Sequence, residues 1–183
     1  MPDLATAAEI AERLRAAGFE TYLVGGCVRD MLLGREPADY DIATAAKPEE
    51  IRALFPRTID VGAAFGVIRV LAPNGEYEVA TFRTEGPYLD GRHPASVQYA
   101  TVREDVARRD FTVNGLLYDP KAAEVLDFVG GRADLAARRI RTIGEPAARF
   151  AEDRLRMLRA VRLAAELDFE IAPEVTAAAR QLA

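Results

Sequence analysis

The stretch LVGGCVRDMLLG at residues 23–34, followed by DYDIAT at residues 39–44, decides the fold predicted for this chain. The first stretch starts as an apolar strand, turns at two adjacent glycines and continues as a short helix that ends at Gly34. The second is a short strand that carries Asp39 and Asp41. A strand, a glycine turn, a helix and a further strand predict a domain that mixes a β-sheet with helices.

The sequence on either side extends this pattern. Residues 6–17 and 47–55 have helical spacing, and two strands are predicted at residues 58–72 and 76–83, joined through the hairpin signal Asn74-Gly75. Residues 101–119 predict two short helical pieces and a strand, and residues 123–131 predict a further strand and turn. Residues 84–101 contain glycines, prolines and few aliphatic residues, so they are expected to form a mobile loop.

Composition excludes several classes of protein. The chain has 183 residues, of which 50% are hydrophobic and 29% are charged, so it can bury a core and is not expected to be disordered. Cys27 is the single cysteine, which rules out an internal disulfide framework and fits the cytosol, the compartment we expect. No apolar run approaches membrane-spanning length. The single histidine, His93, has no partners at ligand spacing, which excludes a histidine–cysteine zinc site.

Positive charge is concentrated in one segment. Residues 132–162 contain nine arginines and four acids, so this segment carries +5 within a chain whose net charge is −5. Such a basic stretch can contact phosphates even on an acidic protein. A solvated helix face is the alternative explanation.

Three carboxylates suggest a metal site. In a strand, residues i and i+2 share a face, so Asp39 and Asp41 are expected to project together. Glu78 lies in another predicted strand, EYEVATF, and would add a third carboxylate. Carboxylates held together in this way suit two Mg²⁺ ions about 4 Å apart, as in two-metal nucleotidyl transfer. Solvated acids on a turn and a strand are the alternative.

Two further motifs suit a nucleotide. The glycines Gly25 and Gly26 lie between a strand and a helix, where backbone amides can approach a triphosphate, and Arg29 lies one turn further on. This is neither a P-loop nor a dinucleotide fingerprint, and a plain strand–helix turn is the alternative. In RRDFTVNGL, the adjacent arginines Arg108 and Arg109, followed by an acid and Asn114, suit phosphate and sugar contacts, and Asp110 could accept a hydrogen bond from a ribose hydroxyl.

The last motif is EDRLRMLR at residues 152–159. One helix is predicted from residue 145 to residue 169, on which Asp153, Arg156 and Arg159 share one face. The opposite, buried stripe is expected to consist of Leu155, Leu158 and Val161. Adenine and cytosine both present an amino donor beside a ring-nitrogen acceptor. Asp153 and Arg156 could pair with that edge, whereas a surface ion pair is the alternative.

The ordered set of motifs resembles one family. LVGGCVRDMLLG, DYDIAT, EVATFR, RRDFTVNGLLYD, DFVGGRADL and EDRLRMLRAVR look like the class II tRNA nucleotidyltransferases and bacterial poly(A) polymerases. The resemblance covers roughly residues 20–170 and implies an α+β fold, a head with a mixed sheet flanked by helices and then an all-helical neck. We expect the head at residues 1–140 and an incomplete neck at residues 141–183, in a chain that is a truncation.

The resemblance also implies site residues. The metal carboxylates would be Asp39, Asp41 and Glu78, and ATP or CTP would be held by the remaining motif residues: Gly25, Gly26, Arg29, Arg109, Asp110, Asn114, Asp153, Arg156 and Arg159. The stretch VGAAFGVIRV lacks the basic pair and histidine usual in the poly(A) polymerases, which favours CCA or A addition to tRNA. A poly(A) polymerase and an inactive fragment that binds nucleotide or RNA remain the alternatives.

Overall fold

The computed structural model describes residues 1–62, 65–86 and 96–182. Its strands are β1 (Thr21–Val24), β2 (Asp41–Thr44), β3 (Thr58–Gly62), β4 (Val67–Ala72), β5 (Gly75–Thr81), β6 (Arg83–Glu85), β7 (Val97–Tyr99), β8 (Leu116–Asp119), β9 (Glu124–Asp127), β10 (Arg139–Ile140) and β11 (Glu170–Ile171). Its helices are α1 (Leu4–Ala16), α2 (Gly26–Leu32), α3 (Pro48–Leu54), α4 (Val102–Ala107), the short 3-10 helix η2 (Thr112–Asn114), α5 (Gly131–Ala136), α6 (Pro146–Glu152), α7 (Leu155–Leu167) and α8 (Pro173–Leu182).

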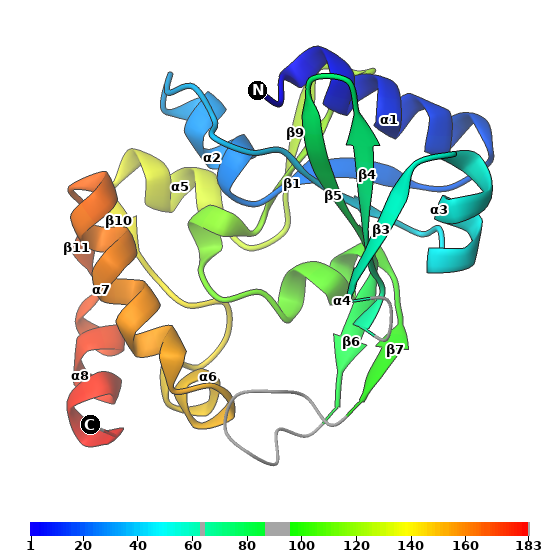
Figure 1. The fold of residues 1–183 in the computed structure, drawn as a ribbon. Coiled ribbons are helices and arrows are strands. Elements are labelled where there is room, and N and C mark those ends of the chain that lie inside the picture. The colour runs from blue at the N-terminus through cyan, green and yellow to red at the C-terminus, as the bar shows by residue number, and fades with distance from the viewer. Residues whose placement is uncertain (63–64, 87–95, 183) are drawn as a thin grey trace.

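Seven of these strands form one mixed sheet in the order β3-β4-β5-β2-β1-β8-β9. Strands β2 and β5 run parallel, and every other neighbouring pair in this sheet is antiparallel. Figure 1 shows α1 alongside the sheet and the helices α6, α7 and α8 at the other end of the molecule. The predicted α+β class, a mixed sheet flanked by helices and followed by a helical segment, is confirmed.

Side chains of the sheet alternate between two apolar clusters. Leu23, Ile42 and Leu116 belong to the larger cluster, which also contains residues from α1 and from α6 to α8. Their neighbours Val24, Ala43 and Leu117 belong to a smaller cluster with α4. This is the period-two alternation of a strand that is covered on both faces. No helix among the described residues is long and apolar enough to cross a membrane.

The central strands end where the motifs lie. Val24 ends β1 opposite Asp41, the first residue of β2. The parallel register Ile42↔Val79 then places Glu78 of β5 beside Asp41. The amide of Gly25 donates to the carbonyl of Leu116, which starts β8. One edge of the sheet therefore gathers the glycine turn and two of the predicted carboxylates.

A single extended segment joins the sheet domain to the C-terminal helices. On one side of residues 139–143, β10 pairs in parallel with β11, which follows α7. On the other side, Phe111 and Thr142 form an antiparallel bridge, flanked by the hydrogen bonds Thr112 N to Arg141 O and Ile143 N to Asp110 O, both 2.9 Å. We call residues 139–143 the connecting segment.

Three predicted elements differ from the structure. Residues 58–72 are not one strand but the antiparallel pair β3 and β4. The segment 84–101 is not a loop at its ends, because β6 and β7 pair there; residues 87–95, and with them His93, lie outside the described residues. The helix predicted from residue 145 to residue 169 divides into α6 and α7, because Asp153 leaves helical geometry at φ −141° and ψ 107°.

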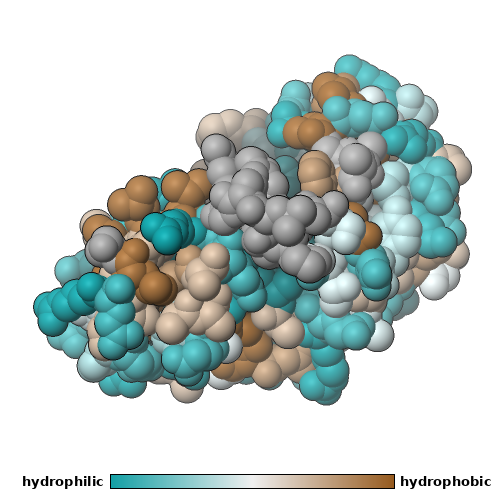
Figure 2. Space-filling view, turned by 90° about the horizontal axis from the view of Figure 1, so that it is seen from below, coloured by the Kyte–Doolittle hydropathy of each residue, from teal (hydrophilic) through white to brown (hydrophobic). Residues whose placement is uncertain are grey.

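The buried side of α7 is also different from the prediction. Leu155, Leu158 and Val161 are exposed by 41%, 69% and 59%. The buried residues are Arg156, Ala160, Leu163 and Leu167, spaced by four, three and four residues. Figure 2 shows hydrophobic side chains gathered on the surface at the helical end of the molecule. The expected buried stripe is therefore wrong, because α7 packs on its Arg156–Ala160–Leu163 side.

Gly131, at the start of α5, allows the close packing of α5 on η2. A methyl group there would lie 2.2 Å from the carbonyl oxygen of Thr112. We expect Gly131→Ala to lower the free energy of unfolding by about 1–3 kcal/mol, the usual cost of overpacking. Urea denaturation measures it. Arg132→Ala, at the exposed next position, should change stability by less than about 0.5 kcal/mol. Equal stability of both variants would contradict this packing.

Candidate active site

Asp41 is the central carboxylate of the site. Its pKa is raised from 3.8 to about 6, first by burial and then by the charges of Glu78 and Asp39, while Arg109 acts in the opposite direction. Glu78 lines the same cavity as Asp41. Negative charge thus accumulates around a buried group, an arrangement that a bound cation would relieve.

Asp39 does not take the predicted position. It is exposed and precedes β2, so the expected pair of aspartates at i and i+2 of one strand is wrong. Among residues 1–62, 65–86 and 96–182, no group of three or more acidic, histidine or cysteine side chains is arranged as a metal cage. The donor chemistry still fits a hard cation, since carboxylate oxygens are what Mg²⁺ and Ca²⁺ prefer, and the charges of Glu78 and Asp39 both raise the pKa of Asp41.

The glycine turn lies directly against these carboxylates. Gly25 has φ 79° and ψ −134°, which favours glycine. A methyl group on it would lie 3.7 Å from Nη1 of Arg109 and 3.9 Å from Oδ2 of Asp41. The turn therefore brings bare backbone between a cationic and an anionic side chain. A ligand with phosphate groups and a metal ion would need both.

Arg29 lies beside the glycine turn, since a methyl group on Gly26 would lie 3.5 Å from its Nη2. Its guanidinium pairs with Asp30 at 2.8 Å and donates to Oδ1 of Asn114 at 2.8 Å. Asn114 lines the cavity, whereas Arg29 does not. Arg29 thus ties α2 to η2 and orients Asn114, and does not itself face the cavity.

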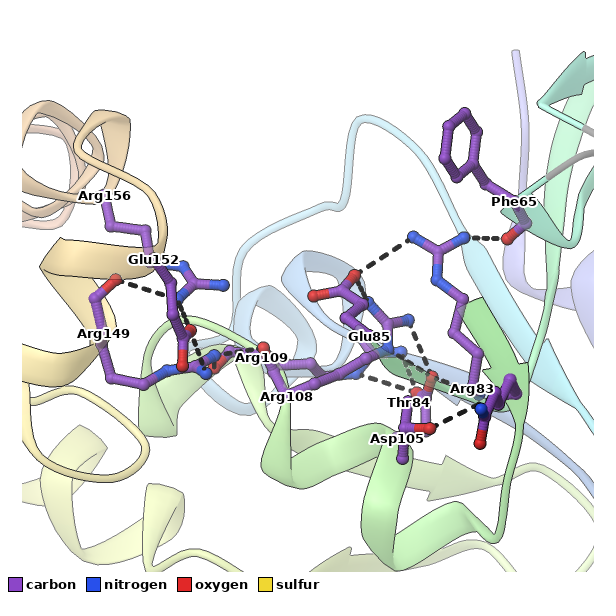
Figure 3. Close-up of polar contacts among 11 residues, drawn as sticks. Phe65, Arg83, Thr84, Glu85, Asp105, Arg108, Arg109, Arg149, Glu152 and Arg156 are labelled. Carbon is purple, nitrogen blue, oxygen red and sulfur yellow. Dashed lines mark hydrogen bonds and ion pairs between the residues drawn. The ribbon is translucent and has the colours of Figure 1, made fainter. Parts of the chain in front are cut away.

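The arginines of the RRD motif are held by a buried acid that the sequence analysis missed. Asp105, 1% exposed, accepts hydrogen bonds from Arg108 at 2.7 Å and from Arg109 at 2.9 Å (Figure 3). Burial alone would raise the pKa of Asp105, but the charges of Arg109 and Arg108 and their hydrogen bonds lower it on balance. The signal was available in sequence, because an acid three and four residues before two arginines on a helix can pair with both.

Arg108 and Arg109 then point to different partners. Arg108 also pairs with Glu85 of β6 at 2.9 Å, and Glu85 pairs with Arg83. Arg109 instead lies against the glycine turn. Arg83, Glu85 and Arg108 all line the cavity, and of these the sequence analysis missed Arg83 and Glu85.

Asp110 connects the RRD motif to α7. Its Oδ1 accepts the amide hydrogen of Phe111 at 2.7 Å, and its Oδ2 forms an ion pair with Nη2 of Arg159 at 2.6 Å. The Asp110 side chain is 9% exposed and that of Arg159 is 53% exposed. The contact joins the two sides of the cavity.

Asp153 and Arg156 face the cavity from the junction of α6 and α7. Oδ1 of Asp153 accepts the amide hydrogen of Leu155 at 2.9 Å, so Asp153 precedes α7 and does not share a continuous helix with Arg156. Arg156 is buried and pairs with Glu152 at 2.6 Å, as does Arg149 (Figure 3). Glu152 is a further residue that the sequence analysis missed.

One cavity of about 440 Å³ collects most of the predicted residues. Ten of the twelve line it, and the two that do not are Asp39 and Arg29. The ten come from the glycine turn, the sheet edge, the RRD motif, the α6–α7 junction and α7: Gly25, Gly26, Asp41, Glu78, Arg109, Asp110, Asn114, Asp153, Arg156 and Arg159. Acids and arginines around one space of this size suit a charged small molecule such as a nucleotide.

Relatives of known identity share the chain's sequence. It is 50% identical over 165 residues to a CCA-adding enzyme of Streptococcus suis (strain 05ZYH33), covering 90% of this chain and 41% of the relative. It is 47% identical over 174 residues to a CCA-adding enzyme of Geobacillus stearothermophilus, covering 94% and 43%. The chain therefore spans about two fifths of the length of these curated relatives.

Solved structures and a family model agree with this. The Bacillus stearothermophilus CCA-adding enzyme in complex with CTP superposes with a TM-score of 0.88 at 44% identity, over 97% of this chain and 43% of that one. The Thermotoga maritima CCA-adding enzyme complexed with tRNA gives 0.76 at 26% identity, over 97% and 41%. The family model for the poly A polymerase head domain matches residues 21–141. The resemblance of the motifs is thereby confirmed, and the chain belongs to the poly A polymerase head-domain family.

Proposed function

We propose that this chain is the catalytic part of an RNA nucleotidyltransferase that adds CMP and AMP, from CTP and ATP, to the 3′ end of tRNA. One observation carries the proposal: a single cavity combines the partly buried carboxylate Asp41 with Arg109 at the glycine turn and with Asp153 and Arg156 near α7. The first two suit the triphosphate and its metal, and the last two suit a base. Relatives solved with CTP and with tRNA support the choice of substrates.

The division of labour follows the order of the chain. We assign residues 1–140 to a catalytic head and residues 141–183 to an incomplete neck that selects the nucleotide. In support, the sheet contributes the carboxylates, and the helical part contributes Asp153, Arg156 and Arg159 to the same cavity. We place the activity in the cytoplasm, the compartment that a free, unpaired Cys27 fits.

Asp41 and Glu78, with Asp39 beside them, would hold two Mg²⁺ ions. When bound, these ions would supply positive charge to the phosphates and align the reacting oxygens. The raised pKa of Asp41 supports the assignment, because after burial its next causes are the charges of Glu78 and Asp39, which a bound cation would offset. The 3′ hydroxyl oxygen of the RNA would then bond to the α-phosphorus and release its proton to solvent, and pyrophosphate would leave as the bond from the α-phosphorus to the α–β bridging oxygen breaks.

The remaining residues bind and orient the nucleotide. The backbone at Gly25 and Gly26 and the guanidinium of Arg109 are placed to contact the triphosphate, and Asp110 to accept from a ribose hydroxyl. Asn114, oriented by Arg29, completes the sugar side. Asp153 can accept from the amino group of adenine or cytosine, and Arg156 can donate to the adjacent ring nitrogen. Glu152 and the Arg149 carbonyl hold the Arg156 guanidinium in place for this.

A poly(A) polymerase is the second candidate, and the name of the matching family model favours it. The same chemistry would then act on other RNAs. Against it, the segment VGAAFGVIRV at residues 61–70 lacks the basic pair of those enzymes. A fragment that binds nucleotide without turnover is the third candidate, since the chain spans about two fifths of its relatives.

Incorporation of radiolabelled CMP and AMP into tRNA lacking its terminal CCA tests the proposal. We expect incorporation by the chain with Mg²⁺, and a loss of about a thousandfold in Asp41→Asn, because several kcal/mol of metal-assisted stabilisation are removed. Asp60→Asn, an exposed carboxylate on β3, is the control and should match the parent. Parent-like rates in Asp41→Asn would refute the metal assignment. Extension of unrelated RNA by AMP alone would identify the poly(A) polymerase, and CTP binding without turnover the silent fragment.

Asp153→Asn tests the base-reading pair. A mispaired base should cost about 2–4 kcal/mol, roughly a 30- to 1,000-fold preference of the parent for ATP and CTP over GTP and UTP. We expect the variant to lose most of this preference, while asparagine retains the acceptor that Leu155 needs. Asp168→Asn, at the exposed end of α7, is the control. Rates with all four nucleotides decide, and an unchanged preference would leave Asp153 as a helix-terminal residue only.

Asp105→Asn tests how Arg109 is positioned. Without the carboxylate, the guanidinium of Arg109 should no longer be oriented toward the triphosphate. We expect KM for CTP to rise roughly 10- to 100-fold, which corresponds to the loss of one charged hydrogen bond of about 1.5–3 kcal/mol. The kcat should change less. The control, Glu104→Gln, keeps the capping contact with Thr101. Steady-state kinetics provide the measurement, and a fall in kcat at constant KM would contradict this positioning role.

A further inference from the structure

Asp110 is fixed on every side but one. Its carbonyl accepts from the amide of Ile143, and its Oδ1 accepts from the amide of Phe111. The remaining oxygen, Oδ2, is buried and accepts no hydrogen bond from the described residues, and Nη2 of Arg159 forms an ion pair with it at 2.6 Å. Both residues line the cavity. The Phe111 amide and the Arg159 guanidinium therefore hold the Asp110 carboxylate together, and Oδ2 keeps free hydrogen-bonding capacity.

Arg159 reaches Asp110 from the helix that also carries Arg156. It lies three residues after Arg156, so the two guanidinium groups leave neighbouring turns of α7. Arg156 is buried and pairs with Glu152, whereas Arg159 is half exposed. Asp110, the partner of Arg159, lies 49 residues earlier in the sequence. The single helix α7 thus carries both Arg156, which we assign to the base, and Arg159, which pairs with Asp110, the residue that we assign to the ribose.

We propose that Arg159 is a positioning residue for sugar recognition: through its ion pair with Asp110 it sets the ability of the site to distinguish ribonucleotides from deoxyribonucleotides. The inference rests on the proposed function, which places the ribose at Asp110. A site that hydrogen-bonds a hydroxyl rejects the analogue lacking it only if the acceptor is held in place. Arg159 supplies that constraint, and it couples the sugar site to the helix that reads the base.

The competing role is a direct contact between Arg159 and phosphate. An arginine that only neutralised phosphate charge would act on ribo- and deoxyribonucleotides equally. The ratio of their affinities therefore separates the two roles, and a merely structural role would leave that ratio unchanged.

The experiment measures binding of CTP and dCTP, and incorporation from each, by the parent and three variants. Arg159→Ala should reduce the CTP-to-dCTP ratio by about tenfold or more, since a misplaced acceptor forfeits a charge-assisted hydrogen bond. Arg159→Lys, which keeps the charge, should recover part of it. Arg162→Ala, an exposed arginine one turn further on that pairs with Glu166, should match the parent. Preference for CTP over UTP should be kept in all three.

A comparison of Asp110→Ala with the double variant Asp110→Ala/Arg159→Ala provides a second test of the inference. If Arg159 acts through Asp110, adding Arg159→Ala to Asp110→Ala should not lower the sugar ratio further. A full sugar ratio in Arg159→Ala, or equal losses for CTP and dCTP, would overturn the inference. A parent that discriminates sugars in binding but incorporates neither nucleotide would refute the proposed activity and leave the role of Arg159 tested. A parent that binds neither nucleotide would overturn both.

Discussion

The placement of Asp41 beside other carboxylates is the constraint on which the arrangement of the surrounding residues depends. Asp41 starts β2, where Val24 lies opposite it and Glu78 beside it. Burial and the neighbouring charges raise its pKa to about 6, so the folded protein tolerates this carboxylate at an energetic cost. The glycine turn and Arg109 lie against it. A cost concentrated at the end of a strand, inside a cavity, is typical of a binding or catalytic site rather than of a stabilising feature.

Ion pairs organise the rest of the cavity. Asp105 pairs with both arginines of the RRD motif, Glu152 pairs with Arg156, and Arg159 pairs with Asp110. In each pair one partner is largely buried, so removing the other partner would leave that buried charge without its counter-charge. These pairs fix the directions of side chains that would otherwise have several free torsions. The arrangement favours a site whose charged groups are oriented before any ligand arrives.

Much of the fold could be predicted, because strand alternation, glycine positions and capping residues are local signals. Three failures have physical causes. In residues 58–72 an apolar run hides the reversal between β3 and β4, where Gly66 has φ 78°. The break at Asp153 was hidden because helical spacing continues across it. On α7 the apolar positions suggested the wrong buried side, since Arg156 is buried by its contacts with Glu152 and the Arg149 carbonyl, and pattern alone does not reveal those contacts. The site residues were predictable as types, whereas the positions of Asp39 and Arg29 needed coordinates; the pairing of Asp105 with two arginines could have been predicted from its spacing and was missed.

The connecting segment has a consequence for recombining this protein with its relatives. Residues 139–143 are hydrogen-bonded to β11 through β10 and to the RRD motif through Phe111 and Thr142. A chimera with its crossover at residue 140 would divide the connecting segment between two parents. A crossover after Gly144 would take the whole connecting segment from one parent, but β11 would then come from the other. The C-terminal helices therefore cannot be exchanged between relatives independently of the rest of the chain. At either crossover, the residues of β10 and β11 from the two parents have to be compatible with pairing.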